Sequence, residues 1–482
     1  MQNSLLQILF FPEFVLLLGT IIILLFGLFF KKNNFSVVSN LSVILLISVA
    51  FLVYFNKDIS FLNFDKYFSN SSFINFFQIL VIFGSLSTII ISVDFYKSNN
   101  LTFFEIPILI LFSTLGMLLL ISSNNLMAMY LGIELQSLTL YVIAALKRDS
   151  LKSSESGLKY FVLGALSSGI LLYGCSLIYG FTGHTDFNEI FIVLNSLENI
   201  NLAIIFGLIF ILVGLAFKVS AVPFHMWTPD VYEGAPTSVT AFFAIVPKIS
   251  GVALIYRFCL EPFSILYNEW SQIIIFLSIA SMLLGGIAAI RQNNIKRLLA
   301  YSSIGHVGYI LIGLASFNFA GLKGAILYML IYVFMNIAIF GILLSLKREN
   351  RYIEKIDELS GLSKSKPIFS FCIAIIMLSM AGIPPFAGFF GKFYIFISAI
   401  DAELFYLAVI GVITSVIAAY YYLKIIKIMY FDEINSSSYQ LHIQTKSIFI
   451  LILSMLIISL FIFYPSLFIN LSSEVSNNFF RK

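Results

Sequence analysis

The sequence predicts an all-α polytopic membrane protein with about fourteen transmembrane helices. Hydrophobic residues make up 60% of the 482 residues and charged residues only 11%, whereas a soluble domain carries about 25% charged residues. Apolar runs of about twenty residues recur along the chain, and a run of that length spans the hydrocarbon core of a bilayer. Each run must be a helix there, because no water satisfies a bare backbone.

The expected spans, in chain order, are 5–30, 37–56, 72–93, 101–122, 126–146, 157–180, 201–222, 237–257, 271–290, 298–316, 321–346, 367–398, 402–430 and 447–472. The first run is too long for a signal-peptide core and has no positive charge before it, so we expect it to remain as a spanning helix. The chain divides into three N-terminal helices (1–98), two five-helix repeats (101–262 and 271–430) and a last transmembrane helix (446–472).

Basic residues predict which side of the membrane each loop faces. With the N-terminus outside, eighteen of the 28 Lys and Arg fall on the inner side and six on the outer side. The positive-inside rule therefore places both chain ends outside. Four lysines belong to no loop and lie within or beside the apolar spans: Lys159, Lys218, Lys248 and Lys392.

A weak internal repeat relates the two halves of the chain. "GLKYFVLGAL" is similar to "GLKGAILYML", and "LMAMYLGIE" ending at Glu134 aligns with "LLAYSSIGH" ending at His306. The proline-broken span near Lys218 then corresponds to a second one near Lys392. The offsets are 164, 172 and 174 residues. Because an odd number of helices separates the copies, the second copy is expected to be inverted across the membrane.

The buried charges indicate transport. A lysine at a helix centre costs roughly 2.5–3.5 kcal/mol, so such groups are expected to face the bundle interior and to meet partners or water. Glu134, well inside the fifth span, requires a cation, which Lys218 or Lys159 could supply. An amine that balances desolvation against a nearby carboxylate can gain and lose a proton. A static ion pair is the alternative, and for Lys159 so is a side chain that reaches up to the headgroups.

Prolines predict where three helices open, because proline cannot donate to the carbonyl four residues earlier. Pro223, Pro247, Pro384 and Pro385 free the carbonyls of Val219, Phe243, Met380 and Ala381, respectively. Such breaks are tolerated where protein or trapped water satisfies the freed groups. Two broken spans that each carry a lysine therefore predict two related sites.

Weaker candidates lie near these lysines. An imidazole at His306, in the middle of its span, could pass protons between Lys248 and Lys392 through water, although a histidine bonded to a neighbouring helix is the alternative. The others are His225, Tyr301, Ser302 and Ser303.

Redox chemistry is not indicated in this chain. Its three cysteines have no metal-site spacing, no histidine cluster is present, and no glycine-rich nucleotide loop follows a strand. Any redox cofactor is therefore expected in a partner.

Five stretches resemble the antiporter-like membrane subunits of NADH–quinone oxidoreductase, respiratory complex I. They are "LGIELQSLTLYVIAAL", "ESGLKYFVLGALSSGILLYG", "FKVSAVPFHMWTPDVYEGAPT", "NIKRLLAYSSIGHVGYIL" and "AGIPPFAGFFGKFYIF". The resemblance covers roughly residues 120 to 400. Subunits L, M and N share this pattern with the large subunits of Mrp-type sodium/proton antiporters. The lack of a long lateral helix and the lysine at position 392, where subunit M has a glutamate, favour the N type.

The resemblance implies a role for each buried charge. Glu134 and Lys218 would form the coupled pair of a first half-channel, Lys248 the central bridge and Lys392 the terminal lysine of a second. Lys159 matches the family's lysine on the sixth span. No family role carries over to Lys323.

The resemblance also implies a proton-translocating subunit of a bacterial inner-membrane complex. FMN, iron–sulfur clusters and quinone would belong to partner subunits, among them the antiporter-like subunit M, and lipid rather than nucleic acid would surround the chain. Two alternatives stay open. A Mrp-type antiporter would show sodium-dependent transport without NADH oxidation. For a structural scaffold with inert ion pairs, replacing Lys218 would leave proton pumping intact while assembly suffers.

Overall fold

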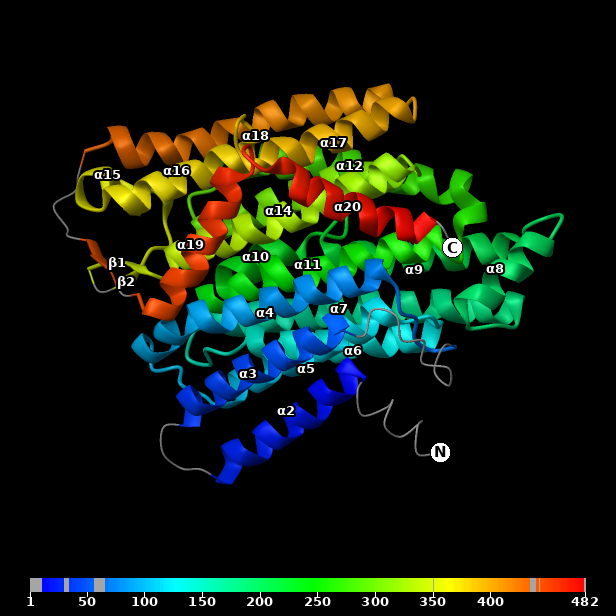
Figure 1. The fold of residues 1–482 in the computed structure, drawn as a ribbon, viewed down its shortest axis with the longest axis horizontal. Coiled ribbons are helices and arrows are strands. Elements are labelled where there is room, and N and C mark those ends of the chain that lie inside the picture. Colours follow the sequence, from blue (N-terminus) through cyan, green and yellow to red (C-terminus); the bar gives the residue numbers. More distant parts are fainter. Residues whose placement is uncertain are drawn as a thin grey trace.

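The computed structural model describes residues 11–29, 34–55, 66–349, 351–433, 439–441 and 443–480. These residues form a bundle of long helices that run roughly along one direction (Figure 1). In the described residues, twelve helices are long and apolar enough to cross a membrane, and one bent pair would make a thirteenth. The predicted all-α membrane fold is confirmed.

The first half contains α2 (Pro12–Phe29), α3 (Asn34–Phe55), α4 (Ser72–Ser98), α5 (Glu105–Ser122), α6 (Leu126–Ala144), α7 (Leu151–Thr182), α8 (Phe187–Ser196), α9 (Leu202–Val219), α10 (Trp227–Gly234) and α11 (Thr237–Leu260). The second half contains η1 (Ser264–Leu266), α12 (Tyr267–Ile290), α13 (Ile295–Ala315), α14 (Phe319–Leu343), η2 (Ile356–Leu359), α15 (Leu362–Ser365), α16 (Pro367–Ala381), α17 (Ala387–Asp401), α18 (Phe405–Phe431), α19 (Thr445–Leu460) and α20 (Pro465–Phe480). Three short antiparallel strands, β1 (Leu346–Arg348), β2 (Arg351–Tyr352) and β3 (Tyr439–Leu441), pair in the order β2-β1-β3 at one end.

Short polar side chains fix where several helices begin. Asn125 accepts a hydrogen bond from the backbone of Met127 at the start of α6, and Asn201 does the same for Ala203 at the start of α9. Asp186 caps α8 in the same way. A cap satisfies backbone donors that the first turn of a helix leaves free. These helix starts are therefore encoded locally, in the loops between apolar runs.

The innermost helices are α11, α13 and α14. In the most apolar 18-residue stretch of each of these helices, 100%, 94% and 100% of the residues are buried, whereas the corresponding share in α2, α3 and α18 is only 33%. Outer helices present apolar side chains such as Ile22 and Val416 to the surroundings, as lipid contact requires. The central position of α11 and α13 matters because these helices carry Lys248 and His306.

Three predicted spans differ from the structure in shape. The span expected at 367–398 is two fifteen-residue helices, α16 and α17. The span expected at 201–222 ends at Val219, and the chain re-enters a helix only at Trp227 in α10. The last span is not straight, because α19 and α20 meet at 94°. Pro465 begins α20 and disfavours helical backbone in the residue before it.

Some expectations lie outside the described residues or remain open. Positions 5–10 and 30 of the first predicted span are outside the described ranges. The inverted repeat and the division of the chain into four parts stay predictions.

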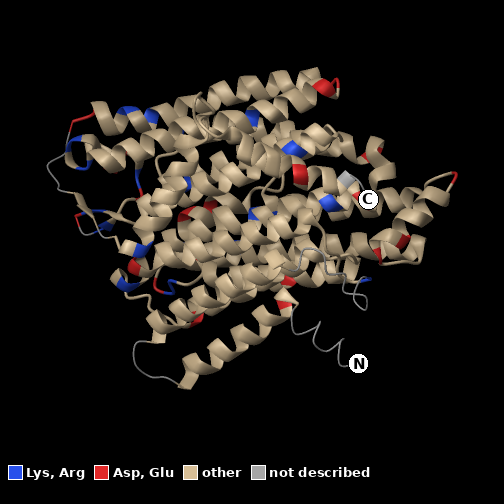
Figure 2. Cartoon of the chain, viewed as in Figure 1, with Lys and Arg blue, Asp and Glu red and all other residues tan. Residues whose placement is uncertain are grey.

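Charged residues are sparse in the middle of the bundle and frequent at its ends (Figure 2). Lys and Arg gather at the end that carries β1, β2 and α15, and the C-terminal end of α20 lies toward the opposite end (Figures 1 and 2). The basic end is the one predicted to face the cytoplasm.

Candidate functional site

Lys218 lies in the last turn of α9 and points into the bundle, with 8% of its surface exposed. Its Nζ donates a hydrogen bond to Oγ of Ser137 on α6 at 2.7 Å. The ammonium group is therefore held by a side chain from a neighbouring helix. The C-terminal turn of α9 adds the negative end of a helix dipole, which favours a cation.

Glu134 lies on α6 one turn before Ser137 and interacts electrostatically with Lys218. In the described part of the chain no ion pair joins Glu134 to Lys218 or to Lys159. Oε1 of Glu134 is buried and has no hydrogen-bond partner among the described residues. A buried carboxylate oxygen without a donor is costly. The position is therefore suited to a water molecule or to a shift of the Lys218 ammonium group.

Lys159 lies in a partly exposed pocket with Asp230 and Arg297, and it forms no ion pair with Glu134 in the described residues. Its Nζ pairs with Glu155 at 2.7 Å and with Asp230 of α10 at 2.8 Å, and 42% of its side chain is exposed. The alternative in which Lys159 supplies the cation for Glu134 is therefore wrong. Helix α7 begins at Leu151, six residues before the predicted span. Lys159 is therefore in the third turn of the helix and reaches Asp230 of α10.

Lys248 occupies the centre of the bundle on α11, with 1% of its surface exposed. Its Nζ donates to Oγ of Ser303 on α13 and lies 5.7 Å from the centre of the Tyr232 ring. The hydroxyl of Tyr232 donates to the carbonyl of Phe243 at 3.0 Å. That carbonyl is the one freed by Pro247, so a tyrosine of α10 fills the predicted opening.

His306 links the centre to the second half through two hydroxyl groups. Its Nδ1 is 2.6 Å from the hydroxyl of Tyr328 on α14, and its Nε2 is 3.1 Å from the hydroxyl of Tyr422 on α18. The Tyr422 hydroxyl also bonds Oγ of Ser302. An imidazole with a partner on each nitrogen can accept a proton on one side and release one on the other.

Lys392 on α17 donates to the main-chain carbonyls of Met380 at 3.2 Å and Ala381 at 2.9 Å. These are the two carbonyls predicted to be freed by Pro384 and Pro385, at the C-terminal end of α16. The side chain is buried, and its Nζ lies 4.9 Å from the centre of the Tyr309 ring.

A cavity of ≈10 Å³ separates Lys392 from the histidine. His306, Tyr309, Lys392 and Tyr422 are among the residues that line it. This volume is about that required for one water molecule. A water there would complete a polar connection between the His306 ring and the Lys392 ammonium group.

Two of the weaker candidates, His225 and Tyr301, lie away from these groups, as does Lys323, which has no expected role. His225 is half-buried between α9 and α10, and burial lowers the pKa of its imidazole. Tyr301 is partly buried on α13 and interacts electrostatically with Arg297. Lys323 lies over the ring of Tyr394, with its Nζ 5.4 Å from the ring centre.

Sequence reasoning missed four residues around the proton-path candidates. The hydroxyl of Ser137 bonds Lys218, the ring of Tyr232 lies beside Lys248, and the hydroxyls of Tyr328 and Tyr422 bond His306. Tyrosine in a spanning helix is expected mainly at the membrane interfaces. The position of Tyr328 and Tyr422 well inside the predicted spans 321–346 and 402–430, away from the interfaces, is the signal that could have identified two of them.

The family model described as "NADH:quinone oxidoreductase/Mrp antiporter, TM" matches residues 123–418, the range that holds every buried charge from Glu134 to Lys392. The chain belongs to this family. The expected family resemblance is thereby confirmed.

Curated relatives are similar over most of their length. NADH-quinone oxidoreductase subunit N of Pelagibacter ubique is 51% identical over 468 residues, which cover 96% of this chain and 98% of that protein. NADH-quinone oxidoreductase subunit N of Rhodospirillum rubrum is 49% identical over 461 residues, with 95% and 94% covered. The expected likeness to subunit N is therefore confirmed.

Two solved structures share the fold. A chain of respiratory complex I from Thermus thermophilus matches with a TM-score of 0.79 and 27% identity, covering 96% of this chain and 99% of that chain. A chain of the Mrp complex from Dietzia sp. matches with a TM-score of 0.84 but only 20% identity, covering 100% and 98%. The second likeness shows the fold alone.

Proposed function

We propose that this chain is the proton-translocating membrane subunit of a NADH–quinone oxidoreductase. The observation that carries the proposal is a series of four buried groups on neighbouring helices, Lys218, Lys248, His306 and Lys392. The first three hydrogen-bond hydroxyl groups, and Lys392 donates to main-chain carbonyls at a helix break. Buried ionisable residues in a membrane protein mark ion or proton pathways. An amine that is desolvated but hydrogen-bonded can exist as ammonium or as neutral amine, which a proton carrier requires.

The proton moves by exchange between neighbouring groups. When Glu134 and the Lys218 ammonium approach or separate, the free energy of the charged amine changes, and Lys218 accepts or releases a proton. Lys248, with Ser303 beside it, takes up the next proton, and His306 passes one between its two hydroxyl partners. Lys392 then exchanges a proton with a water in the adjoining cavity. Each group returns to its starting protonation state at the end of a cycle.

The coupled reaction belongs to partner subunits. NADH oxidation and quinone reduction there would supply the free energy, with FMN, iron–sulfur clusters and quinone bound outside this chain. We place the assembly in a bacterial inner membrane, with the basic end of the bundle in the cytoplasm and both termini in the periplasm. The antiporter-like subunit M is the expected neighbour in the membrane. Lys159 and the weaker candidates His225 and Tyr301 would act at the edge of this path.

A sodium/proton antiporter of the Mrp type is the second candidate, since the matching family model includes Mrp antiporters and a chain of the Mrp complex shares the fold. Identity argues against it, because 20% identity to that chain compares with 51% to a relative named subunit N. The two functions differ in their energy source. An antiporter exchanges sodium for protons in the absence of NADH, whereas the proposed subunit moves protons only during NADH oxidation.

The test uses membrane vesicles that contain the whole complex, with wild-type chain or with Lys218→Ala. We expect NADH-driven proton uptake in sodium-free buffer by the wild type and a severe loss of uptake in the variant at equal amounts of assembled complex. Lys427→Ala, on the exposed end of α18, is the matched control and should pump normally. Normal pumping by Lys218→Ala would favour an inert scaffold, and sodium-driven proton movement without NADH would favour the antiporter.

A further inference from the structure

The short helix α10 touches the surroundings of both the first and the central lysine. At its start, Nε1 of Trp227 donates to the carbonyl of Phe217 at 3.0 Å, and the indole stacks on Tyr160 with a ring separation of 4.3 Å. Phe217 is the residue before Lys218, and Lys218 Nζ lies 5.7 Å from the centre of its ring. The beginning of α10 is therefore attached to the backbone that carries the first lysine.

The middle of α10 reaches the central lysine. The ring centre of Tyr232 lies 5.7 Å from Lys248 Nζ, and its hydroxyl donates to the carbonyl of Phe243. All these groups are buried. Because packed interiors leave little free space, a displacement of α10 must alter the surroundings of Lys218 and Lys248 together.

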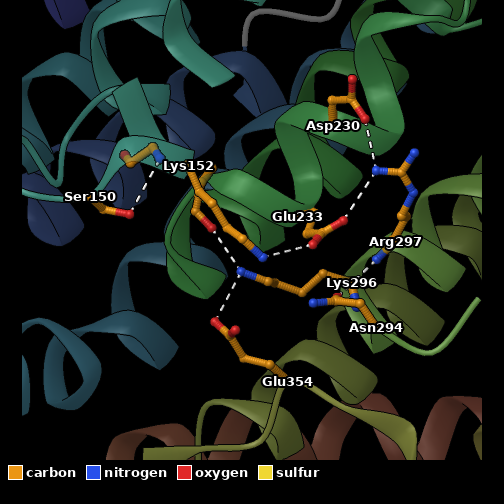
Figure 3. Close-up of polar contacts among 10 residues, drawn as sticks. Ser150, Lys152, Asp230, Glu233, Asn294, Lys296, Arg297 and Glu354 are labelled. Atoms are coloured by element: carbon orange, nitrogen blue, oxygen red, sulfur yellow. Dashed lines mark hydrogen bonds and ion pairs between the residues drawn. The ribbon is translucent and has the colours of Figure 1, made fainter. Parts of the chain in front are cut away.

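On the solvent-facing side of α10, one arginine bridges two carboxylates. Nη1 of Arg297 donates to Oδ1 of Asp230 at 2.7 Å and to Oε2 of Glu233 at 3.1 Å, so it bridges two carboxylates one turn apart (Figure 3). Lys159 from α7 also binds Asp230, and Lys152 binds Glu233 at 3.0 Å. These side chains line a pocket of ≈130 Å³.

The carboxylates of Asp230 and Glu233 are held in their charged form by the neighbouring cations, although both side chains are partly exposed. Burial raises the pKa of Asp230, but hydrogen bonds from Lys159 and Arg297 outweigh it and the pKa lies below its usual value. The pKa of Glu233 is likewise lowered by Lys152 and Arg297 against the effect of burial. Without Arg297, Asp230 would keep Lys159 and Glu233 would keep Lys152, but the described cation that joins the two carboxylates to each other and to α13 would be lost.

We propose that the contact of Arg297 with Asp230 and Glu233 is a clamp that positions α10, so that a change at Lys218 is transmitted to Lys248. Arg297 belongs to the first turn of α13, the helix that also carries Ser303 and His306. The clamp therefore fixes α10 relative to the hydroxyl that binds Lys248. Asp230, Glu233 and Arg297 are positioning residues, and the inference rests on the proposed function.

The experiment compares Arg297→Gln and Asp230→Asn in the whole complex, with assembly, NADH oxidation rate and protons moved per NADH measured on the same vesicles. We expect both variants to assemble and to oxidise NADH, but to move at least about twofold fewer protons per NADH, the scale on which residues along a coupling route act. Arg297→Lys should restore most of the ratio, because an ammonium can also lie between the two carboxylates. Glu155→Gln is the matched control, since Glu155 binds Lys159 but lies outside the clamp, and it should keep the wild-type ratio.

A merely structural role predicts a different pattern. If Arg297→Gln and Asp230→Asn lowered NADH oxidation only in proportion to lost assembly, with an unchanged proton ratio, the clamp would be refuted. Lys218→Ala, assayed in parallel, separates the two ideas. A reduced ratio in Lys218→Ala with a normal ratio in both clamp variants removes only the clamp, whereas normal ratios in all three remove the proposed function as well.

Discussion

The two lysines on either side of Lys248 are held by different kinds of partner. Lys218, in the last turn of α9, donates to the side chain of Ser137, with Glu134 one turn away. Lys392 reaches from α17 back to the final carbonyls of α16. Both ammonium groups are therefore associated with the C-terminal end of a helix, α9 or α16, where the helix dipole favours a cation. Among the described residues, only the first lysine also interacts with a carboxylate.

This difference indicates a division of labour. A serine or glutamate side chain can rotate, so the charge around Lys218 can change without moving a helix. Main-chain carbonyls of a packed helix are fixed, so the hydrogen-bond partners of Lys392 stay in place unless α16 or α17 moves. We infer that the first site receives the signal from the coupled reaction, and that the second passes the proton on.

The largest expected effect comes from disconnecting the two sites. Lys248→Met keeps an unbranched side chain of similar volume but removes the amine that carries the proton. Proton uptake per NADH should fall at least about tenfold, which corresponds to about 1.4 kcal/mol on the barrier. The assay is the initial rate of NADH-driven uptake in vesicles, and full uptake by assembled Lys248→Met would show that the two sites do not communicate through the centre.

A smaller effect is expected at the first site alone. Ser137→Ala removes the hydroxyl that accepts from Lys218, and we expect pumping to fall about fivefold, the equivalent of about 1 kcal/mol for one hydrogen bond. Ser415→Ala is a matched control, because its hydroxyl bonds only within α18. Equal rates in the two variants would remove the special role of a side-chain partner.

The second site can be altered through its backbone. Gly382 has a φ of +84°, and a Cβ there would lie 2.9 Å from Cδ of Lys392. Gly382→Ala should therefore cost about 1–2 kcal/mol of stability, shift Lys392 away from the Ala381 carbonyl, and lower pumping about twofold to threefold. A structure of the variant measures the distance from Nζ to the carbonyl oxygen. An unchanged 2.9 Å contact, with unchanged thermal stability, would contradict this expectation.

The smallest effect is expected from Lys159→Gln. The side chain is 42% exposed, and exposed ion pairs contribute about 0–1 kcal/mol. Arg297 still holds Asp230 in this variant, so pumping per NADH should change less than about twofold. A loss as large as that of Lys248→Met would instead place Lys159 on the main proton path.

Much of this arrangement was predictable from local rules. Apolar runs predict the helices, and the positions of Pro247, Pro384 and Pro385 identify the carbonyls that Tyr232 and Lys392 contact. Both inferences need only backbone geometry. The family also follows from short motifs around the buried charges.

The side chains that contact each buried charge were harder to predict from the sequence. His306 and Tyr422 are 116 residues apart, and no periodic pattern states which helices face each other across the bundle. Lys159 was one of two possible cations for Glu134, beside Lys218, because helices five, six and seven can pack together. In the structure Lys159 pairs with Asp230 instead. The bend between α19 and α20 was missed because residues 447–472 were interpreted as one continuous apolar span, and the break that Pro465 introduces was not considered.

The most direct test of the account measures protons moved per NADH oxidised in proteoliposomes that contain the assembled complex with Lys392→Ala. If buried amines carry protons through this chain, the ratio falls while NADH oxidation continues. An unchanged ratio, at normal assembly and with tight vesicles, would contradict the account.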